Sequence, residues 1–155
     1  REFGIARKIT LTDEGSVHPL YAGKAPVFDG FTSHFDDVEN LPSGSVHLAG
    51  NYITPIQAAI ITHEGTPFWA VQYHPEYDLR EVAALTRFRK EGLIETGYFA
   101  DNAAADSFLT ELETLHTDRS RKDIAWRLGI DEDVMDENIR TLEVKNWIEN
   151  ILREN

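Results

Sequence analysis

His74 and Glu76 are the two side chains whose types and spacing best suit chemistry, and they lie in the stretch VQYHPEY at residues 71–77. In an extended backbone, residues i and i+2 project to the same side, so Glu76 can hold the ring of His74. Such a carboxylate fixes the histidine tautomer and stabilises imidazolium, which is the role of the third member of a nucleophilic triad. Pro75 removes a backbone donor where the strand ends. The pair therefore predicts a general base that activates a nucleophile.

Two other interpretations of this pair stay open on chemistry alone. A histidine and a glutamate at a strand end can bond at the surface without any function, and imidazole and carboxylate groups also bind metal ions. The chain contains no cysteine, so no thiol nucleophile lies within these 155 residues. The histidines outside the candidate motifs are interpreted as ordinary surface or turn residues: His18, His47, His63 and His116.

The composition indicates a globular chain and argues against nucleic-acid and membrane partners. The 155 residues suffice for one domain, or one domain with an appendage, and for a sizeable core. A net charge of -12 disfavours phosphate-rich and anionic-membrane surfaces, which attract basic patches. No apolar run approaches the roughly 18 residues that a membrane span needs. The absence of cysteine excludes a disulfide framework and fits a reducing compartment, which we expect to be the cytoplasm.

The elements that must position His74 and Glu76 change in kind near residue 78. Residues 1–78 are predicted to be rich in strands and turns, whereas residues 79–155 show the three-to-four spacing of amphipathic helices. Residues 18–31 have the proline and glycine punctuation of loops and short turns. The predicted strands are 3–12, 45–51 and two within 56–74 that are joined by a turn at 64–67.

The predicted helices of the second half have recognisable ends. Asp78 is a plausible N-cap for the helix that follows it, and Ser120 for a later one that Gly129 ends. Another helix is predicted over residues 101–118, and a last long amphipathic helix over 131–155. The apolar positions expected to be buried in that last helix are Val134, Ile139, Leu142, Trp147, Ile148 and Ile151.

Two sequence blocks, with PIQAAI at residues 55–60 between them, form a pattern in order and in spacing. FWAVQYHPE at 68–76 resembles the signature G-V-Q-F-H-P-E. Upstream, TSHFDDVENLPSGSVHLAG at 32–50 resembles the segment S-H-x-D-x-V-x-x-L-P-x-G. Both are motifs of the class I glutamine amidotransferase family, and the resemblance is strongest to the amidotransferase half of GMP synthase and its stand-alone relatives.

The resemblance implies roles for particular residues. His74 would be the general base and then the general acid, with Glu76 as its orienting carboxylate. Ser33, His34 and Phe35 fall where family members bring backbone and side chains alongside bound glutamine; the alternative for Ser33 and His34 is a turn capped by Asp36. Gln72 and Tyr73 match the signature and are expected to give structural support.

The family nucleophile is a cysteine in a G-x-C-x-G elbow between a strand and a helix, upstream of the S-H segment. Its thiolate attacks the glutamine carboxamide while backbone N–H groups of the elbow stabilise the oxyanion. REFGIARKITLTDEG at residues 1–15 resembles the stretch that follows this elbow. The chain is therefore expected to be the C-terminal part of an amidotransferase, and to be inactive on its own.

The resemblance also implies a fold and a reaction. The expected fold is α/β: the C-terminal part of a three-layer, flavodoxin-like amidotransferase domain at residues 1–78, with a helical region at 79–155 whose first helix packs on the domain. The intact protein would hydrolyse L-glutamine to glutamate and ammonia and deliver ammonia to a synthetase domain or subunit, with no metal or organic cofactor. Two alternatives stay open: a non-catalytic binding or regulatory module, and a γ-glutamyl hydrolase of the same superfamily.

The C-terminal helices also suggest a helix-turn-helix, which would bind DNA. Residues 121–148 contain a helix, a glycine-containing turn and a second helix. The would-be recognition helix begins with three acids, at 131–133, and residues 119–155 hold nine acidic against seven basic residues. Because DNA phosphates would repel that helix, we expect a packing extension on the domain or on a partner subunit, and a homo-oligomer stays open.

Overall fold

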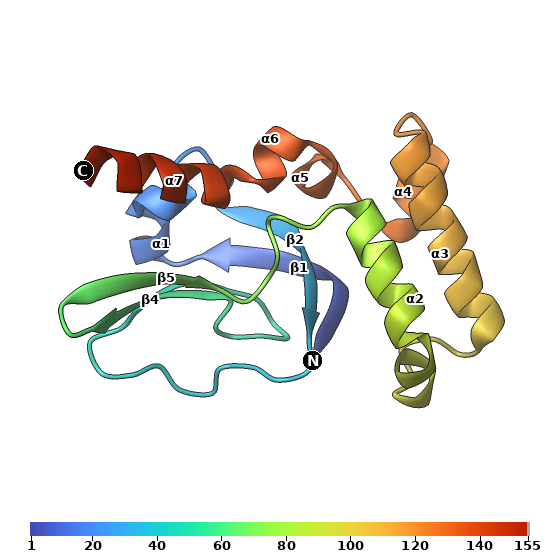
Figure 1. Cartoon of the computed structure of the whole chain (residues 1–155), viewed down its shortest axis with the longest axis horizontal. Helices are drawn as coiled ribbons and strands as arrows, with labels where there is room; N and C mark the ends of the chain where they lie inside the picture. Colours follow the sequence, from blue (N-terminus) through green and yellow to red (C-terminus); the bar gives the residue numbers. More distant parts are fainter. Residues whose placement is uncertain (155) are drawn as a thin grey trace. The chain divides into compact units, whose positions relative to one another are not determined.

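The computed structural model describes residues 1–154 and contains both strands and helices (Figure 1). The chain forms two compact units: Arg1–Glu76 together with the chain from Asp136 onward, and Tyr77–Met135. The first unit holds every strand of the described chain, and the second is helical. The predicted α/β class is confirmed. From the sequence, we predicted a boundary at residue 78 between the amidotransferase portion and a helical region. In the structure, the last two helices belong to the first unit.

A five-stranded antiparallel sheet, in the order β2-β1-β3-β4-β5, forms the body of the first unit. The sheet is curled, and the longest pairing joins β1 to β2, with Glu2 opposite His34 and Thr10 opposite Val27. The strands are β1 (Glu2–Leu11), β2 (Val27–His34), β3 (Val46–Gly50), β4 (Ala58–His63) and β5 (Thr66–Val71).

Four of these strands confirm the predictions, and β2 was missed. Residues 18–31 were predicted to be loops, but only their first part is irregular: a short 3-10 helix, η1 (Pro19–Tyr21), precedes the strand. Of the prolines and glycines that suggested turns, Pro19 starts η1, Pro26 directly precedes β2, and Gly30 lies within β2 against the ring of Tyr73. The residues directly after β1 form a further short helix, α1 (Asp13–Val17), capped by Thr12.

The predicted hairpin between β4 and β5 is confirmed, with a tighter turn than expected. Glu64 and Gly65 both have positive φ, 49° and 81°, and His63 pairs with Thr66. Two central residues with positive φ define a type I′ turn, whose twist matches that of the flanking strands. Pro67 is tolerated because β5 is an edge strand.

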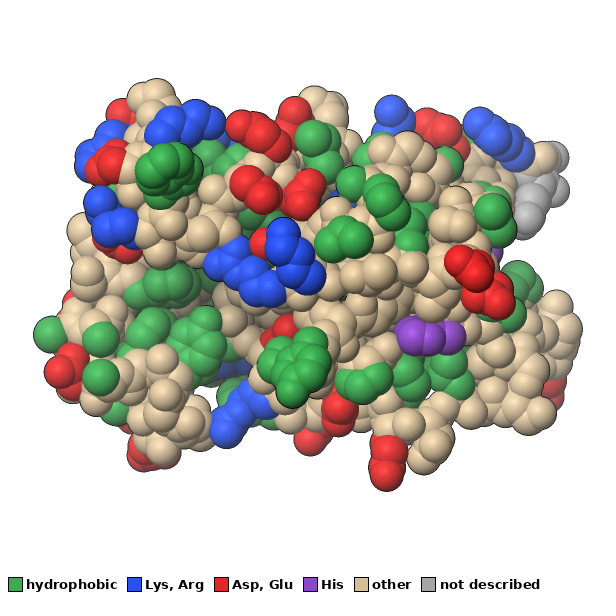
Figure 2. Space-filling model, turned by 180° about the vertical axis from the view of Figure 1, so that it is seen from behind, with side chains coloured by type: hydrophobic (Ala, Val, Ile, Leu, Met, Phe, Trp, Pro, Cys, Tyr) green, Lys and Arg blue, Asp and Glu red, His purple; other side chains and the backbone are tan. Residues whose placement is uncertain are grey.

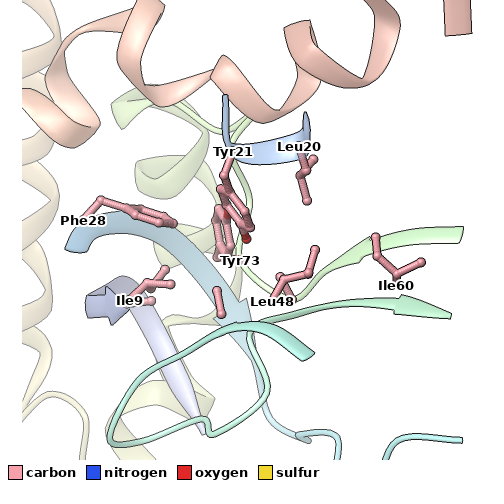
Figure 3. Packing of buried hydrophobic residues seen from close by; sticks show 10 residues of the cluster. Ile9, Leu20, Tyr21, Phe28, Leu48, Ile60 and Tyr73 are labelled. Carbon is pink, nitrogen blue, oxygen red and sulfur yellow. The ribbon is translucent and has the colours of Figure 1, made fainter. Parts of the chain in front are cut away.

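The core of the first unit surrounds Tyr73, the residue before His74 (Figure 3). Figure 3 shows the Tyr73 ring next to Tyr21, with Phe28 and Ile9 on one side and Leu48 on the other. The rings of Phe28 and Tyr73 meet edge to face, with centroids 5.6 Å apart. Burial of these rings fixes the segment that leads into the His-Pro-Glu motif.

The second unit consists of α2 (Leu79–Glu95), α3 (Asn102–Thr117), α4 (Lys122–Leu128) and α5 (Glu132–Met135). Asp78 caps α2 as predicted, in a reciprocal capping box with Glu81. Gly129 ends α4 in the left-handed conformation, also as predicted. Ser120 is not the cap of α4: Arg121 occupies that position, and the Ser120 hydroxyl donates to Asp118 instead.

The last helix is shorter than predicted because Asp136 starts a new one. Its carboxylate accepts from the backbone N–H of Asn138 and caps α6 (Glu137–Arg140), and α7 (Leu142–Glu154) follows. Figure 1 shows α7 above α1, and α7 contacts η1. Val134 is buried as predicted, but Trp147 is about half exposed, so the predicted burial of that helix is only partly found within the chain.

Candidate functional site

His74 and Glu76 form the predicted pair. The Nδ1 atom of His74 lies 2.7 Å from Oε1 of Glu76, and the two side chains are 30% and 55% exposed. A carboxylate only accepts, so Nδ1 carries the proton, and in the neutral ring Nε2 carries the lone pair. The pair therefore has the tautomer that a general base acting through Nε2 requires, and its partial exposure leaves it accessible to other groups.

Backbone hydrogen bonds hold the motif although β5 ends three residues earlier. The N–H of Gln72 donates to the carbonyl of Gln57 at 2.7 Å, and the N–H of His74 donates to the carbonyl of Phe31 at 2.7 Å. The second bond ties His74 to β2, the strand that leads into the S-H segment. The structure thus joins the two sequence blocks through the backbone.

Ser33, His34 and Phe35 lie at and just beyond the end of β2. Ser33 and His34 are within the strand, where they pair with β1, and Phe35 follows with its ring under the guanidinium of Arg1 at 5.3 Å. Ser33 and His34 therefore lie in a strand rather than in the turn of the alternative interpretation, and His34 Nδ1 lies 2.8 Å from the backbone carbonyl of Asp36. That these three residues contact a substrate stays a prediction.

A buried polar cluster around Glu2 was not identified from the sequence. Its carboxylate lies 3.5 Å from His34 Nε2, which connects the cluster to the S-H segment. Its donors come from residues about fifty positions away, which is why no local pattern revealed them. They are Asn51 Nδ2 at 2.9 Å, Thr54 Oγ1 at 2.8 Å and Gln57 Nε2 at 2.6 Å.

A second buried network, also missed, joins Tyr73 to α7. The Tyr73 hydroxyl donates to Glu143 at 2.7 Å, and Lys24 Nζ lies 3.1 Å from the same carboxylate. Burial raises the pKa of Tyr73 well above its usual value, so the hydroxyl keeps its proton and donates it. Tyr73 was expected to give structural support, but Lys24 and Glu143 were not singled out.

The other histidines have surroundings of their own. His63 is exposed in the hairpin, as predicted, and lies 4.0 Å from Glu64. His18 caps η1 and packs edge to face on Trp69, and burial lowers its pKa. Among the residues described, no three metal-ligating side chains gather to form a metal site, so the pair at 74 and 76 has no third ligand there.

The surface charge is mixed on the face that Figure 2 shows, where Lys and Arg side chains lie beside Asp and Glu. In the helical unit the basic side chains are largely paired with acids. Arg127, for example, bonds Glu111 at 2.6 Å and Asp123 at 3.4 Å. None of the described helices is long and apolar enough to cross a membrane.

Comparison with known proteins gives matches that agree with this site. The family model Glutamine amidotransferase class-I matches residues 4–90. A gamma-glutamyl-L-1-hydroxyisopropylamide hydrolase of Pseudomonas sp. is 30% identical over 153 residues, which is 97% of this chain and 51% of that protein. Two proteins named GMP synthase [glutamine-hydrolyzing] match a shorter part. The one from Wolinella succinogenes is 39% identical over 84 residues, which is 54% of this chain. The one from Shewanella amazonensis is 38% identical over 81 residues, which is 49% of this chain.

The matched segment includes β2 to β5, all but the first two residues of β1, and the His-Pro-Glu motif. The chain spans about half the length of the hydrolase and 16% and 15% of the two GMP synthases. Because the family model covers more than half of the chain, and because the signature blocks, the sheet and the His74–Glu76 bond agree with it, this chain belongs to the class I glutamine amidotransferase family.

Proposed function

We propose that this chain is part of an enzyme that hydrolyses a γ-glutamyl amide bond through a Cys-His-Glu triad. His74 is the general base and acid, Glu76 orients it, and a cysteine outside these 155 residues is the nucleophile. The observation that carries the proposal is the 2.7 Å bond between His74 Nδ1 and Glu76, at the end of the VQYHPE stretch. The oxyanion hole would come from the segment that supplies the cysteine.

In this mechanism Nε2 of His74 takes the thiol proton, and the thiolate attacks the γ-carbonyl carbon of the substrate. The tetrahedral intermediate collapses when His74 returns that proton to the leaving nitrogen, which breaks the C–N bond and leaves a glutamyl thioester. His74 then deprotonates a water molecule that attacks the thioester, and glutamate leaves as the thiol is regenerated. Glu76 stabilises the imidazolium that forms in each half-reaction.

The leaving group is ammonia if the substrate is L-glutamine, and an alkylamine if it is an N-substituted γ-glutamyl amide. In the first case ammonia would pass to a synthetase domain or subunit. The extent of the matches supports the second, because the similarity to the gamma-glutamyl-L-1-hydroxyisopropylamide hydrolase continues through the C-terminal helices. The similarity to the GMP synthases covers about half of the chain. We therefore propose an N-substituted γ-glutamyl amide as the preferred substrate.

The substrate test compares kcat/KM of the intact protein, with its cysteine segment, for L-glutamine and for γ-glutamyl-L-1-hydroxyisopropylamide. We expect the alkylamide to be preferred at least about tenfold, because apolar contacts to an alkyl group discriminate by that order. Preference for glutamine, with ammonia released, would assign the protein to the amidotransferases that feed a synthetase. Hydrolysis of neither compound would favour a non-catalytic module.

Replacing Glu76 by Gln in the intact protein should lower kcat by about 10²–10⁴-fold while the fold is retained, because the substitution removes the orienting charge and keeps the shape. The measurement is kcat beside the melting temperature. Glu64→Gln is the matched control, since Glu64 lies 4.0 Å from His63 on the exposed hairpin and should leave kcat unchanged. A wild-type rate for Glu76→Gln would make Glu76 a structural residue.

A further inference from the structure

The side chain of Tyr73 connects the catalytic motif to the C-terminal helix. Residue 73 is Tyr, where the signature that residues 68–76 resemble has Phe. Tyr73 is 2% exposed, and its hydroxyl donates to Oε1 of Glu143, on the first turn of α7, at 2.7 Å. A Phe would fill the same space against Phe28 but would leave this bond unmade, together with the 3.0 Å hydrogen bond between the Tyr73 and Tyr21 hydroxyls.

Glu143 is held on its other side by a buried ammonium group. Lys24 Nζ lies 3.1 Å from its carboxylate and 2.8 Å from the backbone carbonyl of Ile139, and the side chains of Lys24 and Glu143 are each 2% exposed. Lys24 also lies over the ring of Phe28, 4.7 Å from its centroid. The charge of Glu143 is therefore balanced, and its oxygen is fixed where Tyr73 donates.

A buried ion pair is weak evidence of added stability, because apolar residues of similar size often replace such pairs without loss. What the pair provides is a fixed geometry. Asn146, one turn further along α7, strengthens this connection by donating to the carbonyls of Leu20 and Ala22 at 2.9 and 3.0 Å. The helix is thus bonded at two successive turns to η1 and to the residues that follow it.

The position of Tyr73 makes this geometry relevant to His74. The chain bends at Gln72 and Tyr73, and the buried Tyr73 side chain is followed by a His74 side chain that is 30% exposed. The backbone bonds made by the N–H groups of Gln72 and His74 lie on either side of Tyr73. A side-chain anchor between those two bonds limits rotation of the backbone at residue 73, and that rotation sets the direction of the imidazole.

We propose that Tyr73 and Glu143 are positioning residues for His74, so that α7 is part of the catalytic unit rather than an appended helix. This inference rests on the proposed function. The Tyr73–Glu143 bond holds the backbone before His74, and Lys24 holds Glu143. Neither residue touches the reacting atoms, so their effect is on the alignment of His74 with the thiol.

The test uses the intact protein with Tyr73→Phe, Glu143→Gln and the double variant. Tyr73→Phe should lower kcat about 10- to 100-fold with KM unchanged, as expected when a catalytic group is displaced by a fraction of an ångström to one ångström. The double variant should lose little more than Tyr73→Phe alone, because Glu143 is proposed to act on His74 only through the Tyr73 hydroxyl. Glu149→Gln is the control on α7, where the carboxylate pairs with Arg153 at 3.6 Å, and kcat should be unchanged.

The Glu143→Gln variant leaves the buried Lys24 without its anion, so the melting temperature of this variant is measured as well. A second variant combines Glu143→Gln with Lys24→Met, which removes the unpaired charge. A lower melting temperature with wild-type kcat in Tyr73→Phe would overturn the inference, as would fully additive losses of kcat in the double variant. Turnover that survives His74→Ala would instead overturn the proposed function. Loss in His74→Ala with no effect of Tyr73→Phe would refute the positioning role alone.

Discussion

Replacing His74 by Ala in the intact protein should lower kcat/KM for γ-glutamyl amides by at least about 10³-fold. The thiol loses its proton acceptor in acylation, and the leaving nitrogen loses its proton donor, so both chemical steps are affected. Because triad members act as a unit, Glu76→Gln added to His74→Ala should cost little more. The assay follows the released amine and glutamate under single-turnover conditions.

The matched control is His63→Ala, since His63 also lies beside a glutamate but on the exposed hairpin turn. Its kcat/KM should equal that of the wild type. Circular dichroism and the melting temperature show whether His74→Ala still folds, which is expected because its side chain is partly exposed. Substantial turnover by folded His74→Ala at neutral pH would remove His74 from the mechanism.

The features that the sequence predicted well are those specified locally. The hairpin depends on the Glu64-Gly65 turn, the start of α2 on Asp78, and the His74–Glu76 bond on a spacing of two residues. In each case the partners are within a few positions of one another, so composition and spacing contain the information. The resemblance to the family linked the two blocks to one site, and in the structure the backbone bond from His74 to Phe31 joins them.

The features that were missed depend on partners that are distant in the sequence. The buried Glu2 accepts hydrogen bonds from residues 51–57. The buried Lys24 pairs with Glu143, which is 119 positions later in the sequence. Strand β2 was obscured by Pro26 directly before it and Gly30 within it, although β2 pairs with β1 from Val27 to His34 with one irregularity. In the last helix, the cap at Asp136 competes with the apolar periodicity and divides the predicted helix.

The buried network also changes how the C-terminal residues are interpreted. From the sequence, we predicted that residues 119–155 form a packing extension, and that the acidic start of the would-be recognition helix disfavours DNA binding. The structure places α7 in the same unit as the His-Pro-Glu motif and bonds it to the residue before His74. The similarity to the Pseudomonas hydrolase extends through this region, which fits a helix that takes part in the site.

The polypeptide of residues 1–155 alone should show no measurable hydrolysis of glutamine or of a γ-glutamyl alkylamide. The chain has no thiol, so covalent catalysis is lost, and the proposed oxyanion hole, which would contribute about 3–4 kcal/mol, lies in the same segment as the cysteine. His74 would be left to act as a base for water. The measurement compares amine release by this polypeptide, by the intact protein and by a blank.

Supplying the segment that contains the cysteine, fused to Arg1 or as a complementing fragment, should restore turnover. The same segment with Cys→Ala is the control for restored folding without a nucleophile, and it should remain inactive. The His74–Glu76 bond is already formed within these residues, and in the proposed mechanism the added segment provides the thiol and the oxyanion donors. If the pure 155-residue polypeptide releases amine and His74→Ala abolishes that release, the reaction proceeds by direct attack of water, and the cysteine mechanism is wrong.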